Sequence, residues 1–188
     1  MKDEEQLLEK ALQGDSQAFE SLLFPYRQGM LNLALRITLN VEDAQEVCQD
    51  AMLKIFRYLD KYRPEGNMKN WIYQIVANAA RDLLRKRKKQ DLNVSSQSIR
   101  EGEKQSSPED SLLQDEMKDR LQNCFQHLSP KERIVFVLRD VEGHSIQETA
   151  ILLKLSSVSV RTHLSRARRK LRIRFEEIYP EGLGEKKT

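Results

Sequence analysis

Apolar residues recur three or four positions apart along most of the chain, which is the spacing of amphipathic helices. Asp15 or Ser16 is suited to cap the second helix of the first half, and Asn40 the third. Pro25 and Gly29 predict a break or bend within the second helix. The predicted helices of this half span 3–13, 16–37, 41–59 and 69–88. The pattern indicates an all-α fold.

The apolar pattern stops from Gln90 to Ser111, where Ser, Gln, Glu and Lys dominate, and this composition predicts a flexible linker. A helix over 113–128 follows, and then two capping-box sequences, Ser129 to Glu132 and Ser145 to Glu148, each begin another. The chain is therefore expected to form two small helical domains. The predicted units are a domain over 1–89, a linker over 90–111, a second domain over 112–178 and a frayed tail over 179–188.

The segment that follows Ser145 has the order of a helix-turn-helix motif: a short helix, a brief turn and a long basic helix. Lys154 stands in the turn, where Gly would adopt a positive φ most easily. No Asp or Glu lies between Glu148 and Glu176, so we expect the positive charges of the long helix to repel without internal relief. The basic residues are Arg161, Arg166, Arg168, Arg169, Lys170, Arg172 and Arg174. Such a helix suits an anionic partner, although many charged helices are simply solvated.

In a helix-turn-helix protein the second helix enters the major groove of DNA with its N-terminal residues at the base edges. Arg can bond guanine through two hydrogen bonds, and Thr or Ser can meet several base edges or phosphates. The candidate DNA-binding residues are Arg161, Thr162, His163, Ser165, Arg166 and Arg169.

Two helices of the first half carry a second face that the core does not require. On 41–59, Met52 and Phe56 lie beside Gln and acidic residues, which predicts either a partner-binding surface or ordinary core packing. On 69–88, aromatic and basic residues alternate, as they do where proteins bind single-stranded nucleic acid. The alternative there is that Trp71 is a core residue and that the cations favour the helix C-terminus.

The composition of the chain limits which classes of function remain possible. Charged residues make up 32% of the chain and the net charge is only +3, so any electrostatic effect must be local. No apolar run approaches the ~18 residues of a membrane span, and we expect a cytoplasmic protein without membrane insertion. Cys48 and Cys124 occupy apolar helix positions and are expected to be buried thiols. No metal-ligand spacing, phosphate loop or carboxylate cluster is present, so we predict no cofactor, no metal and no enzyme.

These motifs, in this order, resemble the bacterial sigma-70 family, and specifically the two-domain extracytoplasmic-function (ECF) sigma factors. Glu42-Asp43 with Gln49-Asp50 and Phe56 is similar to the polymerase-binding helix of that family. The run from Trp71 to Asn78 resembles its promoter-opening helix. The runs from Leu128 to Arg133 and from Val160 to Arg168 resemble its second DNA-binding domain, domain 4.

The resemblance implies a factor that directs core RNA polymerase to promoters through minus-35 and minus-10 elements. It implies polymerase contacts, at the beta-prime clamp helices, by Gln45, Glu46, Gln49, Asp50, Met52 and Phe56. It implies minus-10 recognition and opening by Tyr62, Arg63, Asn70, Trp71, Tyr73, Asn78, Arg81, Arg85 and Lys88, with Asn78 near a flipped base. The basic helix would then hold the minus-35 element. Further expected partners are the polymerase beta flap and an anti-sigma factor.

One alternative to a sigma factor is a stand-alone transcription regulator, whose helix-turn-helix would bind an operator. Such a regulator should dimerise and prefer palindromic half-sites, whereas a sigma factor should bind polymerase and recognise DNA in two blocks. No symmetric dimer surface is evident in the sequence, which favours the sigma factor.

Overall fold

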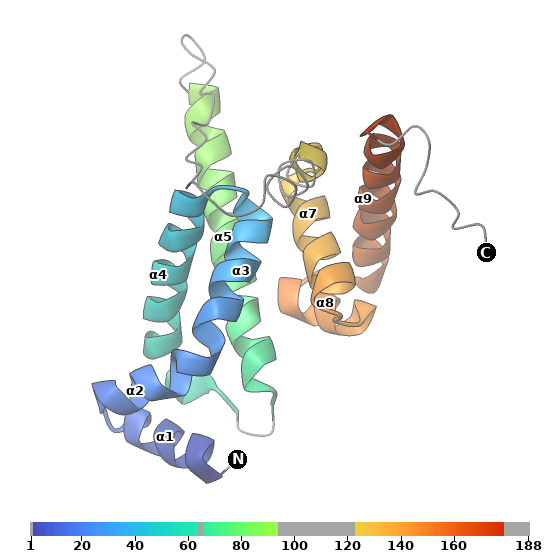
Figure 1. Cartoon of the computed structure of the whole chain (residues 1–188). Coiled ribbons are helices and arrows are strands. Elements are labelled where there is room, and N and C mark those ends of the chain that lie inside the picture. The colour runs from blue at the N-terminus through green and yellow to red at the C-terminus, as the bar shows by residue number, and fades with distance from the viewer. Residues whose placement is uncertain (1, 64–65, 94–122, 179–188) are drawn as a thin grey trace, which may run out of the picture.

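The computed structural model describes residues 2–63, 66–93 and 123–178, and every regular element in those ranges is helical (Figure 1). The α-helices are α1 (Lys2–Leu12), α2 (Ser16–Leu23), α3 (Arg27–Thr38), α4 (Val41–Arg57), α5 (Met68–Asn93), α7 (Pro130–Phe136), α8 (Ile146–Leu153) and α9 (Ser157–Ile178). Two short 3-10 turns, η1 (Phe24–Tyr26) and η2 (Leu59–Lys61), and a π-helical segment, η3 (Val137–Val141), complete them. The expected all-α fold is confirmed.

The predicted capping residues begin the helices as expected. Asp15 accepts hydrogen bonds from the first turn of α2, and Asn40 accepts one from Asp43 at 2.7 Å at the start of α4. Both capping boxes form, at Ser129 for α7 and at Ser145 for α8. These caps satisfy backbone N–H groups that a helix start leaves without partners.

The N-terminal domain is a bundle of α3, α4 and α5, with α1 and α2 at one end (Figure 1). Its core holds fully buried side chains from all three bundle helices, including Leu33, Ile37, Val47, Ile55 and Ile72. The predicted break near Pro25 is present, because η1 separates α2 from α3. Cys48 is only half-buried, so the expectation of a buried thiol holds for Cys124 and only in part for Cys48.

Helix α5 is longer than its apolar pattern indicated. It runs to Asn93, past the expected domain end at residue 89, and keeps the basic run of residues 85–89 helical. The rest of the predicted linker, and most of the predicted helix over 113–128, lie outside the described residues.

In the C-terminal domain, α7 lies between α5 and α9, and α8 closes one end (Figure 1). Lys154 caps α8 in the left-handed conformation, with φ of 53°, and Ser156 accepts a hydrogen bond from Ser159 N at 3.1 Å to begin α9. Val160, Leu164 and Ala167 bury the inner stripe of α9. This is the predicted helix-turn-helix arrangement.

The two domains pack together through one continuous apolar cluster, in which α3 and α5 meet α7 and α8. The sequence left their relative arrangement open. Among the described residues, no helix has the length and apolarity that crossing a membrane requires.

Candidate functional site

One set of cations on α9 is exposed to solvent. Arg161, Arg166 and Arg169 are exposed, and no acidic side chain of the described residues pairs with them. Thr162 and Ser165 are exposed beside them, with the Thr162 hydroxyl donating to Val158 O at 2.9 Å. These side chains follow one another at helical spacing, so they form a compact polar and basic surface.

His163 differs from the other five candidates on α9. It is half-buried, and its Nδ1 is enclosed without a hydrogen-bond partner among the described residues. Burial lowers the pKa of this imidazole, and the nearby cations Lys131 and Arg166 lower it further. His163 is therefore a neutral side chain that faces inward rather than a member of the exposed basic surface.

The other cations of α9 overturn the expectation that the charges of this helix lack internal relief. Arg168 forms two hydrogen bonds to Asp140, at 2.8 and 2.7 Å, and Lys170 bonds the buried carboxylate of Glu132 at 2.7 Å. Further along the helix, Arg172 pairs with Glu176 and Arg174 with Glu177. The acids that the sequence pattern did not connect with α9 come from α7 and η3, or from its own last turns.

Trp71 lies beside Tyr62 at the start of α5, with ring centroids 5.3 Å apart and the planes tilted by 49°. Tyr62 also donates its hydroxyl to Gly66 O at 2.8 Å, which fixes the loop that precedes the helix. Arg63 is exposed and Asn70 is half-buried at the same end. Arg85 and Lys88 are exposed on the C-terminal part of α5, so the helix carries aromatic groups near one end and cations near the other.

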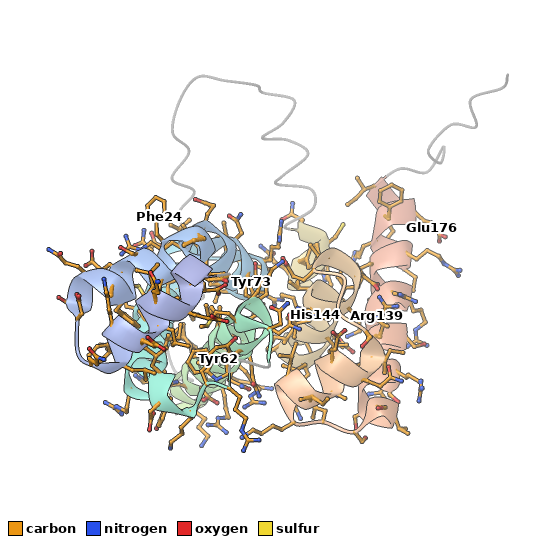
Figure 2. The ribbon with its side chains drawn as sticks, turned by 90° about the horizontal axis from the view of Figure 1, so that it is seen from below. Phe24, Tyr62, Tyr73, Arg139, His144 and Glu176 are labelled. Carbon is orange, nitrogen blue, oxygen red and sulfur yellow. The ribbon has the colours of Figure 1, made fainter. Side chains whose placement is uncertain are left out.

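Three further candidates on α5 lie against the C-terminal domain or in the bundle. Tyr73 is 4% exposed and packs edge-on against His144 (Figure 2). Arg81 donates to Leu153 O at 3.2 Å. Asn78 is half-buried, and its Oδ1 has no partner among the described residues. The structure thus brings Tyr62, Arg63, Asn70 and Trp71 together at one end of α5, buries Tyr73 and leaves Arg81 partly exposed.

The candidate polymerase surface lies on the solvent side of α4. Gln45, Glu46, Gln49, Asp50 and Phe56 are exposed, whereas Met52 is half-buried against the core. The Phe56 ring also contacts Phe19 edge-on, at 5.1 Å between centroids. Ordinary core packing therefore explains most of the apolar surface of Met52 and part of that of Phe56.

Leu53 belongs to the same face of α4 and was not predicted. It is 67% exposed, far more than Met52, and lies four residues after Gln49 and three before Phe56. Its helical spacing from those two residues was the signal that could have found it.

Known families match both domains. Residues 24–90 match the model of sigma-70 region 2, and residues 118–171 match that of sigma-70 region 4. The RNA polymerase sigma-H factor of Pseudomonas aeruginosa is 31% identical over 88% of this chain and 90% of its own. The chain belongs to the sigma-70 family. It is an ECF sigma factor, which directs RNA polymerase to promoters, and this sets aside the stand-alone regulator.

Other relatives agree with this assignment. The ECF sigma factor SigW of Bacillus subtilis is 25% identical over 91% of this chain and 96% of its own. The fold is that of RpoE of Bartonella quintana, solved in complex with the anti-sigma factor NepR, at 20% identity and a TM-score of 0.68 over 84% of this chain and 96% of that one. Sigma factors are non-enzymatic initiation factors that bind core RNA polymerase and promoter DNA.

Proposed function

We propose that the cations of α9 that lack an acidic partner read the minus-35 element of the promoters this sigma factor recognises. The observation that carries the proposal is the division of the α9 cations into two sets. Arg161, Arg166 and Arg169 have no acidic partner in the described parts of the chain, whereas Arg168 and Lys170 are held by Asp140 and Glu132. A cation without a protein partner can meet a base edge or a phosphate without first breaking an ion pair.

Arg166→Ala tests this assignment against a matched control. We expect binding to a minus-35 duplex to weaken by about 1 to 3 kcal/mol, roughly 5- to 150-fold, and the preference at one base pair to relax. Arg172→Ala is the control, because Arg172 is exposed on the same helix but pairs with Glu176 at its far end. Arg172→Ala should lose little DNA affinity, and the loss should be the same on all DNA sequences. Equal loss on every sequence for Arg166→Ala would refute its role in reading bases.

The minus-10 element is assigned to α5, from Trp71 to Lys89, and to the loop before it. Tyr62 and Trp71 offer rings on which unpaired bases can stack, and Arg63, Arg85 and Lys88 are exposed cations that can follow the phosphates. Asn78 is assigned to the region of the extruded base. Binding of the melted strand would favour opening without an energy source, because unstacking one base costs only a few kcal/mol.

The exposed face of α4 is proposed to dock on the beta-prime clamp helices of the polymerase, and the C-terminal domain on the beta flap. Leu53→Ser and Asp50→Ala should weaken capture of core RNA polymerase by the purified full chain. Gln28→Ala, an exposed change on α3, is the control. If neither Leu53→Ser nor Asp50→Ala weakens capture of the polymerase, the docking surface does not lie on α4.

We further propose a cytoplasmic location and regulation by an anti-sigma factor. The structural relative RpoE of Bartonella quintana binds such a factor, NepR, which supports the second proposal by analogy of fold alone.

A further inference from the structure

An apolar side chain lies at the start of the exposed side of α9. Val158 is 69% exposed and is the second residue of the helix, ahead of the cations proposed to read the minus-35 element. The Thr162 hydroxyl donates to Val158 O at 2.9 Å, one helical turn further on. Exposed residues continue from Val158 at steps of three and four, the spacing of neighbours on one side of a helix. The outer face of α9 so defined consists of Val158, Arg161, Thr162, Ser165, Arg166 and Arg169.

The core does not account for Val158. The inner stripe of α9 is filled by Val160, Leu164 and Ala167, all of them buried. Val158 precedes Val160 by two residues, which places it about 200° away around the helix, on the opposite side. An apolar group that is left in water next to polar neighbours gains free energy when a partner covers it.

The start of α9 also fixes the direction of this side chain. Ser156 Oγ accepts a hydrogen bond from Ser159 N at 3.1 Å, and the hydroxyl oxygens of Ser156 and Ser159 are 2.9 Å apart. These bonds define the backbone on both sides of Val158. A valine in a helix has one strongly preferred rotamer, so little side-chain freedom is lost when a partner covers it. Val158 is therefore a rigid apolar group on the outer face.

The chemistry of the major groove offers one matching partner. The C5 methyl of thymine is the apolar group that the four bases present there, and the other major-groove positions are hydrogen-bond donors and acceptors that an isopropyl group cannot satisfy. The N-terminal residues of the second helix are the ones that a helix-turn-helix protein places at base edges. We infer that Val158 is a specificity-determining residue, which selects thymine at one position of the minus-35 element by contact with its C5 methyl group. This inference rests on the proposed role of α9 at that element.

Helix geometry limits where this thymine lies. Val158 and Arg161 are three residues apart, which is about 4.5 Å along the helix axis. Successive base pairs are about 3.4 Å apart, so the thymine should lie within about two base pairs of the position at which Arg161→Ala relaxes the preference. The base 5-methylcytosine carries a methyl group at the same ring position, so it should be preferred to cytosine there.

Removal of single methyl groups from the DNA tests the inference. Holoenzyme is assembled from the full chain and core RNA polymerase. Its affinity is measured for fragments of a promoter that it transcribes, in which each thymine of the minus-35 element is replaced in turn by uracil. Uracil pairs with adenine as thymine does and lacks only the methyl group.

The same DNA series is measured with two variants of the protein. Val158→Ala removes the two terminal methyl groups of the side chain, and it should fold because alanine is the most favourable residue in a helix. Ile151→Ala is the matched control. Ile151 is also a large apolar residue of the helix-turn-helix, 71% exposed, but it belongs to α8 and not to the outer face of α9.

We expect one uracil replacement to weaken binding of the original holoenzyme about fourfold, which corresponds to about 0.8 kcal/mol for one methyl-sized group. Val158→Ala should weaken binding to the thymine fragment by a similar factor. It should also make the thymine and uracil fragments bind equally at that position. Ile151→Ala should keep the fourfold ratio between them.

Three results would overturn the inference. The first is that no uracil replacement weakens binding. The second is a ratio between thymine and uracil fragments that stays the same in Val158→Ala, because the methyl group would then act through the DNA alone. The third is a loss in Val158→Ala that is equal on every fragment, which would assign Val158 to the stability of the domain or to a contact with protein.

Arg166→Ala, measured on the same fragments, separates these results from failure of the proposed function. If Arg166→Ala relaxes the preference at one base pair while Val158→Ala leaves the methyl effect unchanged, α9 reads the element without Val158 and only the inference fails. If Arg166→Ala and Val158→Ala both lose affinity equally on all sequences, the assignment of α9 to base reading fails as well.

Discussion

Glu132 is predicted to stabilise the C-terminal domain by fixing the start of α7 and the middle of α9 at once. Its carboxylate is 5% exposed and accepts hydrogen bonds from Ser129 N at 2.8 Å and from Lys170 Nζ at 2.7 Å. Burial alone would raise the pKa of this carboxyl, but the hydrogen bonds from Lys170 and Ser129 together hold the pKa below its usual range. The ionised form is therefore the one that stabilises the fold.

The expected cost of removing the charge follows from these contacts. Glu132→Gln keeps an oxygen that can accept from Ser129 N but loses the charge-assisted bond to Lys170. Such bonds contribute about 1.5 to 3 kcal/mol, and the solvent exposure of Lys170, at 39%, reduces this to about 1 kcal/mol. Glu132→Ala also loses the capping interaction, which contributes about 1 kcal/mol, so its total cost is about 2 kcal/mol.

Urea unfolding followed by two probes measures this cost. Far-ultraviolet circular dichroism reports both domains, whereas fluorescence of the single tryptophan, Trp71, reports the N-terminal domain. A double-mutant cycle of Glu132→Gln with Lys170→Met should give a coupling free energy of about 1 kcal/mol in the transition that fluorescence does not report. Glu148→Gln is the matched control: it occupies the second capping box but is exposed, and no lysine pairs with it in the described residues. Its effect should be smaller.

The pH dependence of the Glu132 effect has a definite sign. The pKa of Glu132 is depressed in the folded domain, so its contribution is complete above the pKa of an unfolded Glu, about 4.3, and is lost as the pH falls through the lower folded value. The difference between the original chain and Glu132→Gln should therefore shrink below about pH 4.3. A coupling near zero at pH 7, or a difference that persists undiminished in acid, would refute the argument.

Three further outcomes are expected. Asp140→Asn should release Arg168 and lower the free energy of unfolding by at most about 1 kcal/mol, because Arg168 is half-exposed. The released cation should raise the DNA affinity that depends on salt but not on sequence, which titrations at several salt concentrations will measure. Gly29→Ala should destabilise the N-terminal domain in urea by about 1 to 3 kcal/mol, because its Cβ would lie 2.5 Å from Tyr73 Oη, and Tyr73→Phe should restore part of the loss. Burial lowers the pKa of His144, so the folded protein binds fewer protons there than the unfolded chain, and its stability to urea should fall as the pH drops through about 6.5, but not in His144→Phe. The titratable or charged groups that face His144 are Tyr73, Lys69, Glu142 and Glu148.

Local signals in the sequence were sufficient for the helix starts. Asn40, Ser129 and Ser145 bond to backbone groups three residues away, so the capping pattern carries all the information that each helix start needs. Leu53 and Met52 show the limit of such patterns. Both are apolar residues on one helix, and only the position of the neighbouring elements decides that Met52 packs inward while Leu53 stays 67% exposed.

The partners of the basic residues could not be predicted from local sequence patterns either, because they too depend on which elements the tertiary fold brings together. Arg168 and Asp140 are 28 positions apart, and Arg133 and Ile37 are 96 apart. Nothing in the spacing of either pair distinguishes a cation that binds an acid or a carbonyl from one that binds DNA. The sequence could select Arg161, Arg166 and Arg169 as DNA-binding candidates by their place on the helix, but only the tertiary fold shows which of the seven cations of α9 are paired with acids.

Arg81 connects this division to regulation. A guanidinium can donate to a helix C-terminal carbonyl or, more strongly, to a phosphate oxygen, so promoter DNA bound on α5 as proposed would compete with Leu153 O for the same group. On the proposed assignment of α5 to minus-10 DNA, the strand gains the Arg81 guanidinium only when the bond to Leu153 O breaks, and that exchange lowers the net affinity by the free energy of the lost bond. A variant that removes the contact at Leu153 without changing α5 should therefore bind the strand more tightly with no new contact to it.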